Sequence, residues 1–219
     1  MRRVDDEPTG TKLSLIRAAG ELFAQRGLCG TSTRAIADKA GSNIGCIHYY
    51  FGGKEGLYWA AVEYVFHRRI TDQNVGVTLP EQATPQTVAD ALGELVRRRV
   101  LASCGPDVPA WHSQLLWRNV VDGLGSTHPG LLENVFQADF DRFAALVRRV
   151  RAELTDPQVR RLLYQMIAQL IFYVRYQPKV LRELGVAEYD TDLLGEVANH
   201  IARSLTRMLD LPDPARRGE

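Results

Sequence analysis

The stretch TSTRAIADKAGSNIGCIHYYFGGKEGLY, residues 31–58, contains two short helical segments separated by a glycine turn. A serine can cap the first helix, over 32–40, and Gly41 can end it. An asparagine can cap the second helix, over 43–50, before the Gly52-Gly53 pair interrupts the chain. Two helices joined by a short glycine-containing turn are typical of a helix-turn-helix motif, in which the second helix is presented to DNA.

The segment before this motif favours a third helix, over residues 11–26. Its apolar residues recur at spacings of three and four and therefore lie on one face: Leu15, Ile16, Ala19, Leu22 and Phe23. Such a face can pack against the two short helices. The sequence thus predicts a three-helix DNA-binding domain over residues 9–56.

The remaining chain also shows helical spacing and no alternating strand pattern, so the fold class is all-α. Expected helices cover 54–70, 84–103, 107–121, 129–154, 156–176 and 191–209. Residues 75–83 are aperiodic, contain Gly76 and Pro80, and are interpreted as a linker. We expect a helical effector-binding and dimerisation domain over 57–211 and a flexible tail over 212–219.

Composition narrows the class of protein. The chain has 219 residues, of which 45% are hydrophobic and 24% charged, as in ordinary globular proteins. No apolar run approaches the roughly 18 residues that span a bilayer, and the first residues lack a secretory h-region, so we expect a cytoplasmic protein. Its three cysteines follow no metal or redox spacing. The net charge of +1 does not by itself indicate a nucleic-acid partner.

Residues 11–58 resemble the N-terminal domain of TetR-family transcriptional regulators. The resemblance rests on motifs that include the Glu21-Leu22-Phe23-Ala24 run, Gly30-Thr31-Ser32, and Tyr49-Tyr50-Phe51-Gly52-Gly53-Lys54. It implies a homodimeric regulator that is not an enzyme, needs no cofactor, and binds a palindromic double-stranded operator. It also implies a small-molecule effector, whose binding releases a repressor from DNA.

By the same resemblance, the DNA contacts come from the two motif helices and the start of the next one. The candidates are Thr33, Arg34, Asn43, Ile44, Gly45, Cys46, His48, Tyr49, Tyr50 and Lys54. The Arg34 guanidinium suits a guanine edge, and Ile44 suits a thymine methyl group. Lys54, beside free backbone N–H groups, suits a phosphate.

Three positions depart from the family pattern. The family commonly has lysine or a small polar residue at Ile44, threonine at Cys46 and tyrosine at His48. No lysine or arginine lies between Asn43 and Phe51. Phosphate affinity must therefore come from Arg34, Lys54 and backbone groups.

Residues 162–209 resemble the C-terminal domain of the CecR (CerR) branch of this family, where the last two long helices form the dimer. An apolar stripe supports this expectation from the residues themselves: Leu193, Leu194, Val197, Ala198, Ile201, Ala202, Leu205, Met208 and Leu209. Two such helices from each protomer would make a four-helix interface. The stripe is also compatible with the core of a single subunit. A twofold dimer would set the recognition helices roughly 34–36 Å apart, or at a multiple of that distance.

Aromatic residues mixed with a few polar groups are typical of a ligand pocket. The expected ligand-binding residues are Trp111, His112, Trp117, Arg118, Tyr164, Phe172, Tyr173 and Tyr176, with Gln114 and His128 as further polar candidates. Taken singly, each of them is more often an ordinary core or surface residue than a ligand contact.

Three other functions remain as alternatives. Oxidation of Cys46 in a DNA-facing helix would make a thiol-redox-responsive regulator. A metal sensor would use Cys104, His112 and His128, whose spacing matches no compact ligand motif. An all-α enzyme would need a catalytic constellation that the sequence motifs do not reveal.

Overall fold

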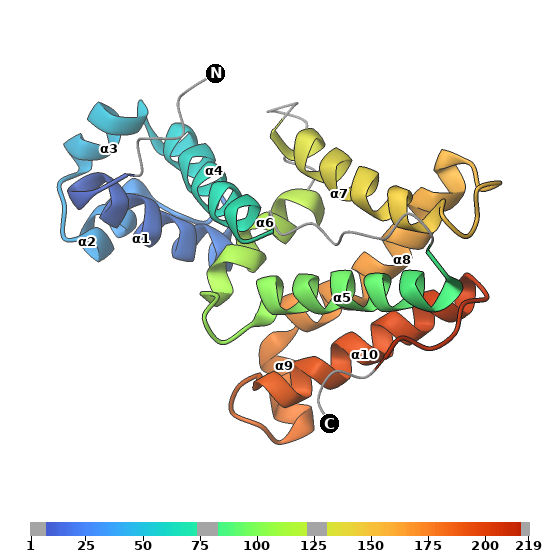
Figure 1. Cartoon of the computed structure of the whole chain (residues 1–219). Coiled ribbons are helices and arrows are strands. Elements are labelled where there is room, and N and C mark those ends of the chain that lie inside the picture. The colour runs from blue at the N-terminus through green and yellow to red at the C-terminus, as the bar shows by residue number, and fades with distance from the viewer. Residues whose placement is uncertain (1–7, 74–82, 122–130, 216–219) are drawn as a thin grey trace. The chain divides into compact units, whose positions relative to one another are not determined.

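The computed structural model describes residues 8–73, 83–121 and 131–215, and all regular secondary structure among them is α-helical (Figure 1). The helices are α1 Gly10–Arg26, α2 Thr33–Ala40, α3 Ile44–Phe51, α4 Lys54–Gln73, α5 Pro85–Cys104, α6 Ala110–Val121, α7 Leu131–Val147, α8 Asp156–Arg175, α9 Gln177–Leu184 and α10 Thr191–Met208. The predicted all-α class is confirmed. None of the described helices is long and apolar enough to cross a membrane.

The chain divides into two compact units. The first contains residues 1–71 and 111–124, and the second contains residues 72–110 and 125–219. The first unit therefore combines α1 to α4 with α6, which the sequence assigns to a later domain. Whether the functional boundary falls between residues 56 and 57 stays a prediction.

Local capping fixes the ends of the motif helices. The Ser32 hydroxyl accepts a hydrogen bond from the Ala35 amide at 3.1 Å, and the Asn43 side chain accepts one from the Gly45 amide at 2.9 Å. Gly41 closes α2 in the left-handed conformation, with φ at 62°. These are the capping residues that the sequence indicates.

The first unit has a core of residues from α1, α2, α3 and α4. Phe23, Ile36 and Ile47 are fully buried. The Phe23 ring meets the Tyr58 ring edge-on, with centroids 5.0 Å apart. The Tyr58 hydroxyl then donates to the Asn119 side-chain oxygen at 2.9 Å, which links α4 to α6.

Trp111 packs α6 against α1 and α4 in the same unit. Its ring stacks on Tyr64 of α4, with centroids 6.4 Å apart and planes 9° apart. It also fills the space beside Gly20 of α1, where a Cβ atom would overlap three indole carbons. The glycine inside this helix therefore has a packing role.

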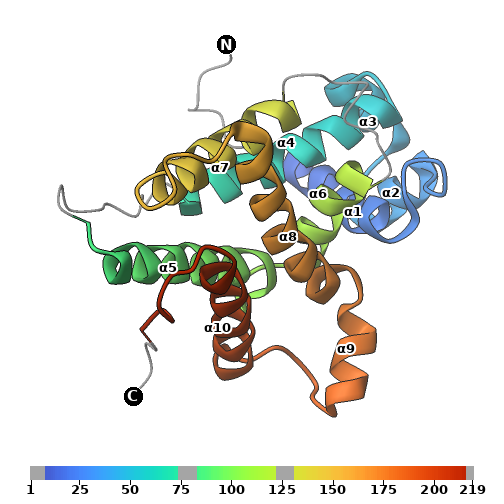
Figure 2. The same ribbon diagram turned by 90° about the vertical axis from the view of Figure 1, so that its right-hand side faces the viewer.

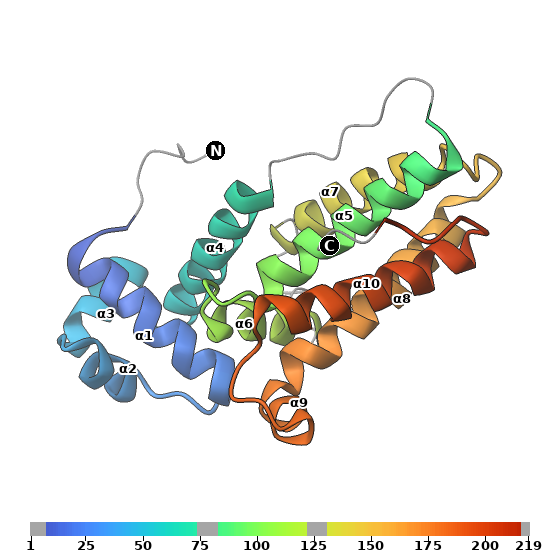
Figure 3. The same cartoon turned by 60° about the horizontal axis from the view of Figure 1, so that its bottom comes forward.

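The second unit is built around α5 and α10, which run side by side in Figures 1 and 3. This packing buries most of the apolar stripe of α10: Leu194, Val197, Ala198, Ile201, Ala202, Leu205 and Leu209. The stripe is thus core of one subunit, because α5 and α8 of the same chain cover it. The expectation that this stripe forms the dimer interface is wrong for these residues; Met208 remains 40% exposed.

Helix ends in the second unit differ from the sequence prediction at two places. The helix expected to reach residue 154 ends at Val147, and a further helix, α9, follows α8 (Figure 2). Pro178 lies in the first turn of α9, where its missing N–H is tolerated. The predicted linker lies outside the described residues except for Ala83.

Residues 212–215 of the tail that is predicted to be flexible contact α5 and α10. Pro214 is buried against Gly93 of α5, and the Ala215 amide donates to the Asp90 carboxylate at 2.8 Å. Asp213 also lies 3.4 Å from the Arg203 guanidinium. Residues 216–219 lie outside the described residues.

Candidate nucleic-acid interface

The outer face of α3 exposes large side chains to solvent. Ile47 is fully buried, whereas Tyr49 is 82% exposed and Ile44 is 38% exposed. Gly45, His48 and Tyr50 are exposed as well, and Cys46 is half-buried. A helix of eight residues thus anchors one side in the core and presents apolar, aromatic and hydrogen-bonding groups on the other.

The predicted contacts on α2 differ in accessibility. The Arg34 side chain is 83% exposed, and its Nε lies 4.0 Å from the Asp38 carboxylate. A solvated ion pair of this length restrains the guanidinium little. Thr33 is half-buried at the first position of the helix.

Lys54 has an intramolecular partner. Its ammonium group donates to the Thr31 carbonyl oxygen at 3.0 Å, which ties the start of α4 to the segment before α2. The Thr31 hydroxyl in turn donates to the Gly27 carbonyl oxygen at 2.8 Å, at the end of α1. Lys54 therefore positions the motif, and phosphate binding by its remaining donors stays a prediction.

Lys39 is a cation of α2 that also serves the fold. It pairs with Glu21 of α1 at 2.8 Å. Of the cations on α2 and at the start of α4, Arg34 is the one whose side chain reaches furthest into solvent. The electrostatic part of any DNA binding by these elements thus depends most on Arg34 and on backbone amides.

The predicted ligand-binding residues fall into two groups. Trp111, His112, Trp117 and Arg118 belong to α6 in the first unit, where Trp117 is 3% exposed and Arg118 approaches Gly27. Gln114 of the same helix is half-buried. His128 lies outside the described residues.

The other group lies in the second unit, with Tyr164, Phe172 and Tyr173 on α8 and Tyr176 directly after its end. Tyr164, Phe172 and Tyr176 are 58%, 46% and 50% exposed, and the last two rings pack with centroids 5.2 Å apart. Tyr173 is half-buried. These aromatic residues form an exposed row; a pocket shared with α6 stays a prediction.

The sequence analysis missed a small cavity in the second unit. It holds about 130 Å³ and is lined by residues that include Ser103, Cys104, Gln177, Glu188 and Tyr189. The sequence singles out only Cys104, as a metal-ligand candidate, and three separate segments contribute the lining residues. Among the described residues, no group of three His, Cys, Asp or Glu side chains is placed to hold a metal ion.

In comparisons with known proteins, the family model matches the N-terminal part of the chain. Residues 15–61 match the family model for "Bacterial regulatory proteins, tetR family". The chain is 48% identical over 54 residues to the HTH-type transcriptional dual regulator CecR of Shigella flexneri, a match that covers 25% of this chain and 24% of CecR. It is 32% identical over 82 residues to the HTH-type transcriptional repressor NicS of Pseudomonas putida, covering 36% of this chain and 39% of NicS.

Similarity in fold extends over most of the chain. A solved TetR-like transcriptional regulator from a Rhodococcus species superposes with a TM-score of 0.60, covering 93% of this chain and 98% of the other at 17% sequence identity. The sequence matches, by contrast, span only about a quarter to two fifths of the curated relatives. The CecR-like assignment of residues 162–209 therefore stays a prediction.

Proposed function

We propose that this chain, whose N-terminal segment belongs to the TetR family of bacterial regulatory proteins, is a homodimeric transcriptional repressor that a small molecule releases from its operator. The observation that carries the proposal is the outer face of α3. This face exposes side chains that are costly to leave in water, in the segment that matches the family.

The exposed groups suit the major groove of DNA. Ile44 can contact a thymine methyl group, and Gly45 lets the backbone approach closely. His48 can donate to a base edge or a phosphate, and the Tyr49 hydroxyl can reach a phosphate. Arg34, at the second position of α2, is the candidate for bidentate contact with guanine.

For the dimer we propose the outer face of α8, in place of the buried stripe of α10. Tyr164, Ala168, Phe172 and Tyr176 recur every four residues and are exposed. A second copy of the chain can cover this row through a twofold axis, because the same patch then meets itself. Recognition helices of the two protomers would read a palindromic site with half-sites one turn, or a multiple of one turn, apart.

Release by an effector requires that the ligand binds the DNA-free conformation more tightly than the DNA-bound one. The second unit contains the described cavity and an exposed aromatic row, both outside the DNA-binding motif. The likeness in sequence to NicS, a transcriptional repressor, supports repression as the mode of action.

The test is fluorescence-anisotropy binding of the purified protein to the DNA upstream of its own gene, against scrambled DNA, at two salt concentrations. We expect specific binding that weakens as salt rises. Arg34→Ala should lose roughly 1–3 kcal/mol of binding free energy if this guanidinium reads a guanine.

Arg182→Ala is the matched control, because Arg182 is an exposed arginine on α9 in the other unit. It should bind the DNA as the unaltered protein does. Equal affinity of the protein for DNA from several upstream regions and for scrambled DNA would contradict specific repression.

A further inference from the structure

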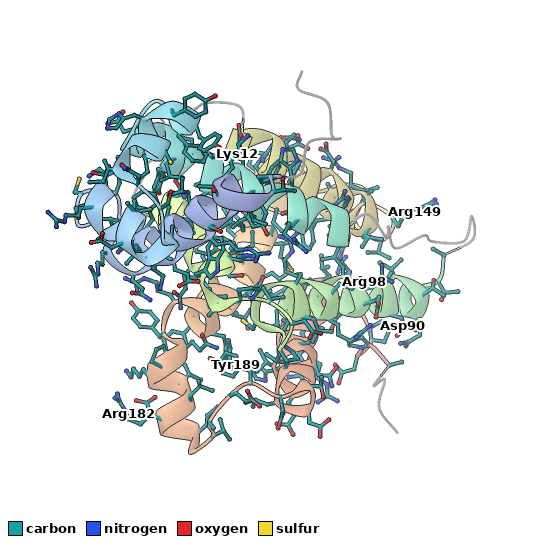
Figure 4. All side chains as sticks on the ribbon, turned by 90° about the vertical axis from the view of Figure 1, so that its left-hand side faces the viewer. Lys12, Asp90, Arg98, Arg149, Arg182 and Tyr189 are labelled. Carbon is teal, nitrogen blue, oxygen red and sulfur yellow. The ribbon has the colours of Figure 1, made fainter. Side chains whose placement is uncertain are left out.

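The described cavity lies where three segments of the second unit meet. It is formed by the end of α5 and the residues after it, by the junction of α8 and α9, and by the segment before α10. Figure 4 labels Tyr189 in this region, between α10 and the helix that carries Arg182. The volume of about 130 Å³ is roughly ten times what one water molecule needs, so a ligand of a few heavy atoms fits.

The polar side chains that line the cavity belong to Ser103, Gln177, Glu188 and Tyr189. Glu188 is the one charged residue among those that line the cavity. The Tyr189 side chain is buried, and its hydroxyl donates to the Tyr173 carbonyl oxygen at 3.0 Å. The hydroxyl oxygen therefore keeps its lone pairs for a ligand that donates. Burial, and then the neighbouring Cys104 and Tyr173, raise the pKa of Tyr189, which keeps the phenol neutral.

Helix ends add to the negative potential. α5 ends at Cys104 and α8 ends at Arg175, and the C-terminus of a helix carries partial negative charge. The N-terminus of α9 begins directly after α8 and carries partial positive charge. However, its Lys179 and Val180 amides already donate to the Tyr176 carbonyl oxygen, each at 2.9 Å.

Two cations on the neighbouring elements have other partners and do not line the cavity. The Arg175 guanidinium lies over the Tyr176 ring, 5.9 Å from its centroid. Lys179 lies 3.7 Å from the Glu183 carboxylate, on the exposed side of α9. The residues that line the cavity include no lysine and no arginine. Glu188 therefore has no cationic partner among them.

We propose that this cavity binds a compact organic cation, an ammonium group with a small apolar body. Glu188 and the Tyr189 oxygen would face the charge, and the Tyr189 ring can add a cation–π contact. Val108, Ala110 and Val174 supply apolar surface for the body of the ligand. On the basis of the proposed function, the bound cation is the effector that makes the protein release its DNA.

The chain itself offers a route from the cavity to the DNA-binding motif. Ala110 lines the cavity, and the next residue, Trp111, packs against Gly20 of α1 in the first unit. A ligand that shifts residues 105–110 therefore acts on the segment that leads directly into the packing of α6. This continuity supports an effector role for the site.

The test uses the full chain with Cys29→Ser and Cys46→Ser, which leaves Cys104 as its one thiol. The rate of Cys104 alkylation by iodoacetamide is measured with tetramethylammonium chloride, with tert-butanol, and with sodium chloride at the same ionic strength. We expect tetramethylammonium alone to slow alkylation several-fold. The same salt should raise the melting temperature of the unaltered chain, because a ligand that binds the folded state stabilises it.

Glu188→Gln removes the charge, and Glu183→Gln is the matched control because Glu183 is exposed on α9 and does not line the cavity. We expect Glu188→Gln to require roughly tenfold more tetramethylammonium for the same protection, and Glu183→Gln to require no more. Equal protection by tert-butanol, or protection that Glu188→Gln leaves unchanged, would overturn the proposal. So would the absence of both protection and a melting shift.

The unaltered chain, with all three cysteines in place, is titrated with the DNA of the preceding test in the presence and absence of tetramethylammonium chloride. Binding of the cation by a protein that binds no DNA would contradict the proposed function and leave the cation site standing. Specific DNA binding without cation binding would contradict the site alone. A bound cation that leaves DNA affinity unchanged would overturn its role as the effector.

Discussion

Gly20 has no side chain, and the indole of Trp111 occupies the space that a side chain would need. Gly20→Ala must therefore displace Trp111 from α1, and we expect it to lower the free energy of unfolding by about 1–3 kcal/mol. Urea unfolding followed by tryptophan fluorescence measures this in the first unit, because Trp59, Trp111 and Trp117 all belong to it.

Gly195→Ala is the matched control, since Gly195 lies inside α10 and a Cβ there meets nothing within 4 Å. Alanine should stabilise that helix by about 0.5–1 kcal/mol, which circular dichroism can follow. A Gly20→Ala variant as stable as the unaltered protein would show that Trp111 moves aside without cost.

Glu94 illustrates how residue chemistry sets a pH dependence. Burial alone would raise the pKa of this carboxyl, but hydrogen bonds from Arg97 at 3.0 Å and Arg98 at 2.6 Å outweigh burial and hold it below the ordinary value. Because the pKa of Glu94 is lower in the folded than in the unfolded chain, its ionised form stabilises the fold. This stabilisation is fully present above the unfolded pKa, about 4.3, and is lost as the pH falls through the folded pKa.

We therefore expect the urea midpoint of the unaltered protein to fall more steeply with acid, below about pH 4.3, than that of Glu94→Gln. Glu183→Gln serves as the control, because its exposed pair with Lys179 contributes little. Parallel acid profiles for Glu94→Gln and the unaltered protein would contradict the assigned cause.

At the scale of elements, one buried ion pair joins α5 to α7. Arg99 donates to the Asp139 carboxylate at 2.6 Å, and the two side chains are 11% and 4% exposed. Arg99→Ala leaves the carboxylate buried without its cation, so we expect a loss of about 3–5 kcal/mol in unfolding free energy.

Replacing both partners, as in Arg99→Leu with Asp139→Leu, should recover most of this loss, because no charge is then buried. Arg97→Ala is the single-site control, since Arg97 shares Glu94 with Arg98 and is 40% exposed; it should cost less than about 1 kcal/mol. Chemical denaturation of the four proteins checks the order, and a double variant no more stable than Arg99→Ala would contradict it.

The elements that local chemistry determines could be predicted from sequence. Ser32 and Asn43 cap their helices within three residues, so α2 and α3 follow from short-range pattern alone. The placement of α6 beside α1 could not be predicted, because it depends on Trp111 meeting Gly20, 91 positions earlier in the chain. An apolar stripe on α10 looks the same whether its own subunit or a partner covers it.

The same distinction holds for the sites. The exposed face of α3 follows from helical spacing around the buried Ile47. The cavity combines Cys104 with Gln177 and Tyr189, more than 70 positions later in the chain, and no sequence motif connects them. Only the packing of the second unit brings these residues together.

At the scale of the whole molecule, the assembly depends on which apolar surface remains after the subunit has folded. Folding buries the stripe of α10 and leaves Tyr164 and Phe172 of α8, with Tyr176 directly after it, exposed. We therefore expect Phe172→Glu to shift the protein from dimer to monomer, because a twofold interface would bury two such carboxylates close together.

Sedimentation velocity over a range of protein concentrations measures this shift. Met208→Glu is the matched control: Met208 is the exposed end of the α10 stripe, 40% accessible, and the same charge there should leave the dimer intact. The two variants distinguish an interface on α8 from one on α10. If Met208→Glu dissociates the dimer and Phe172→Glu does not, the interface lies on α10. Loss of the dimer in Phe172→Glu should also weaken operator binding, because a single recognition helix reads only one half-site.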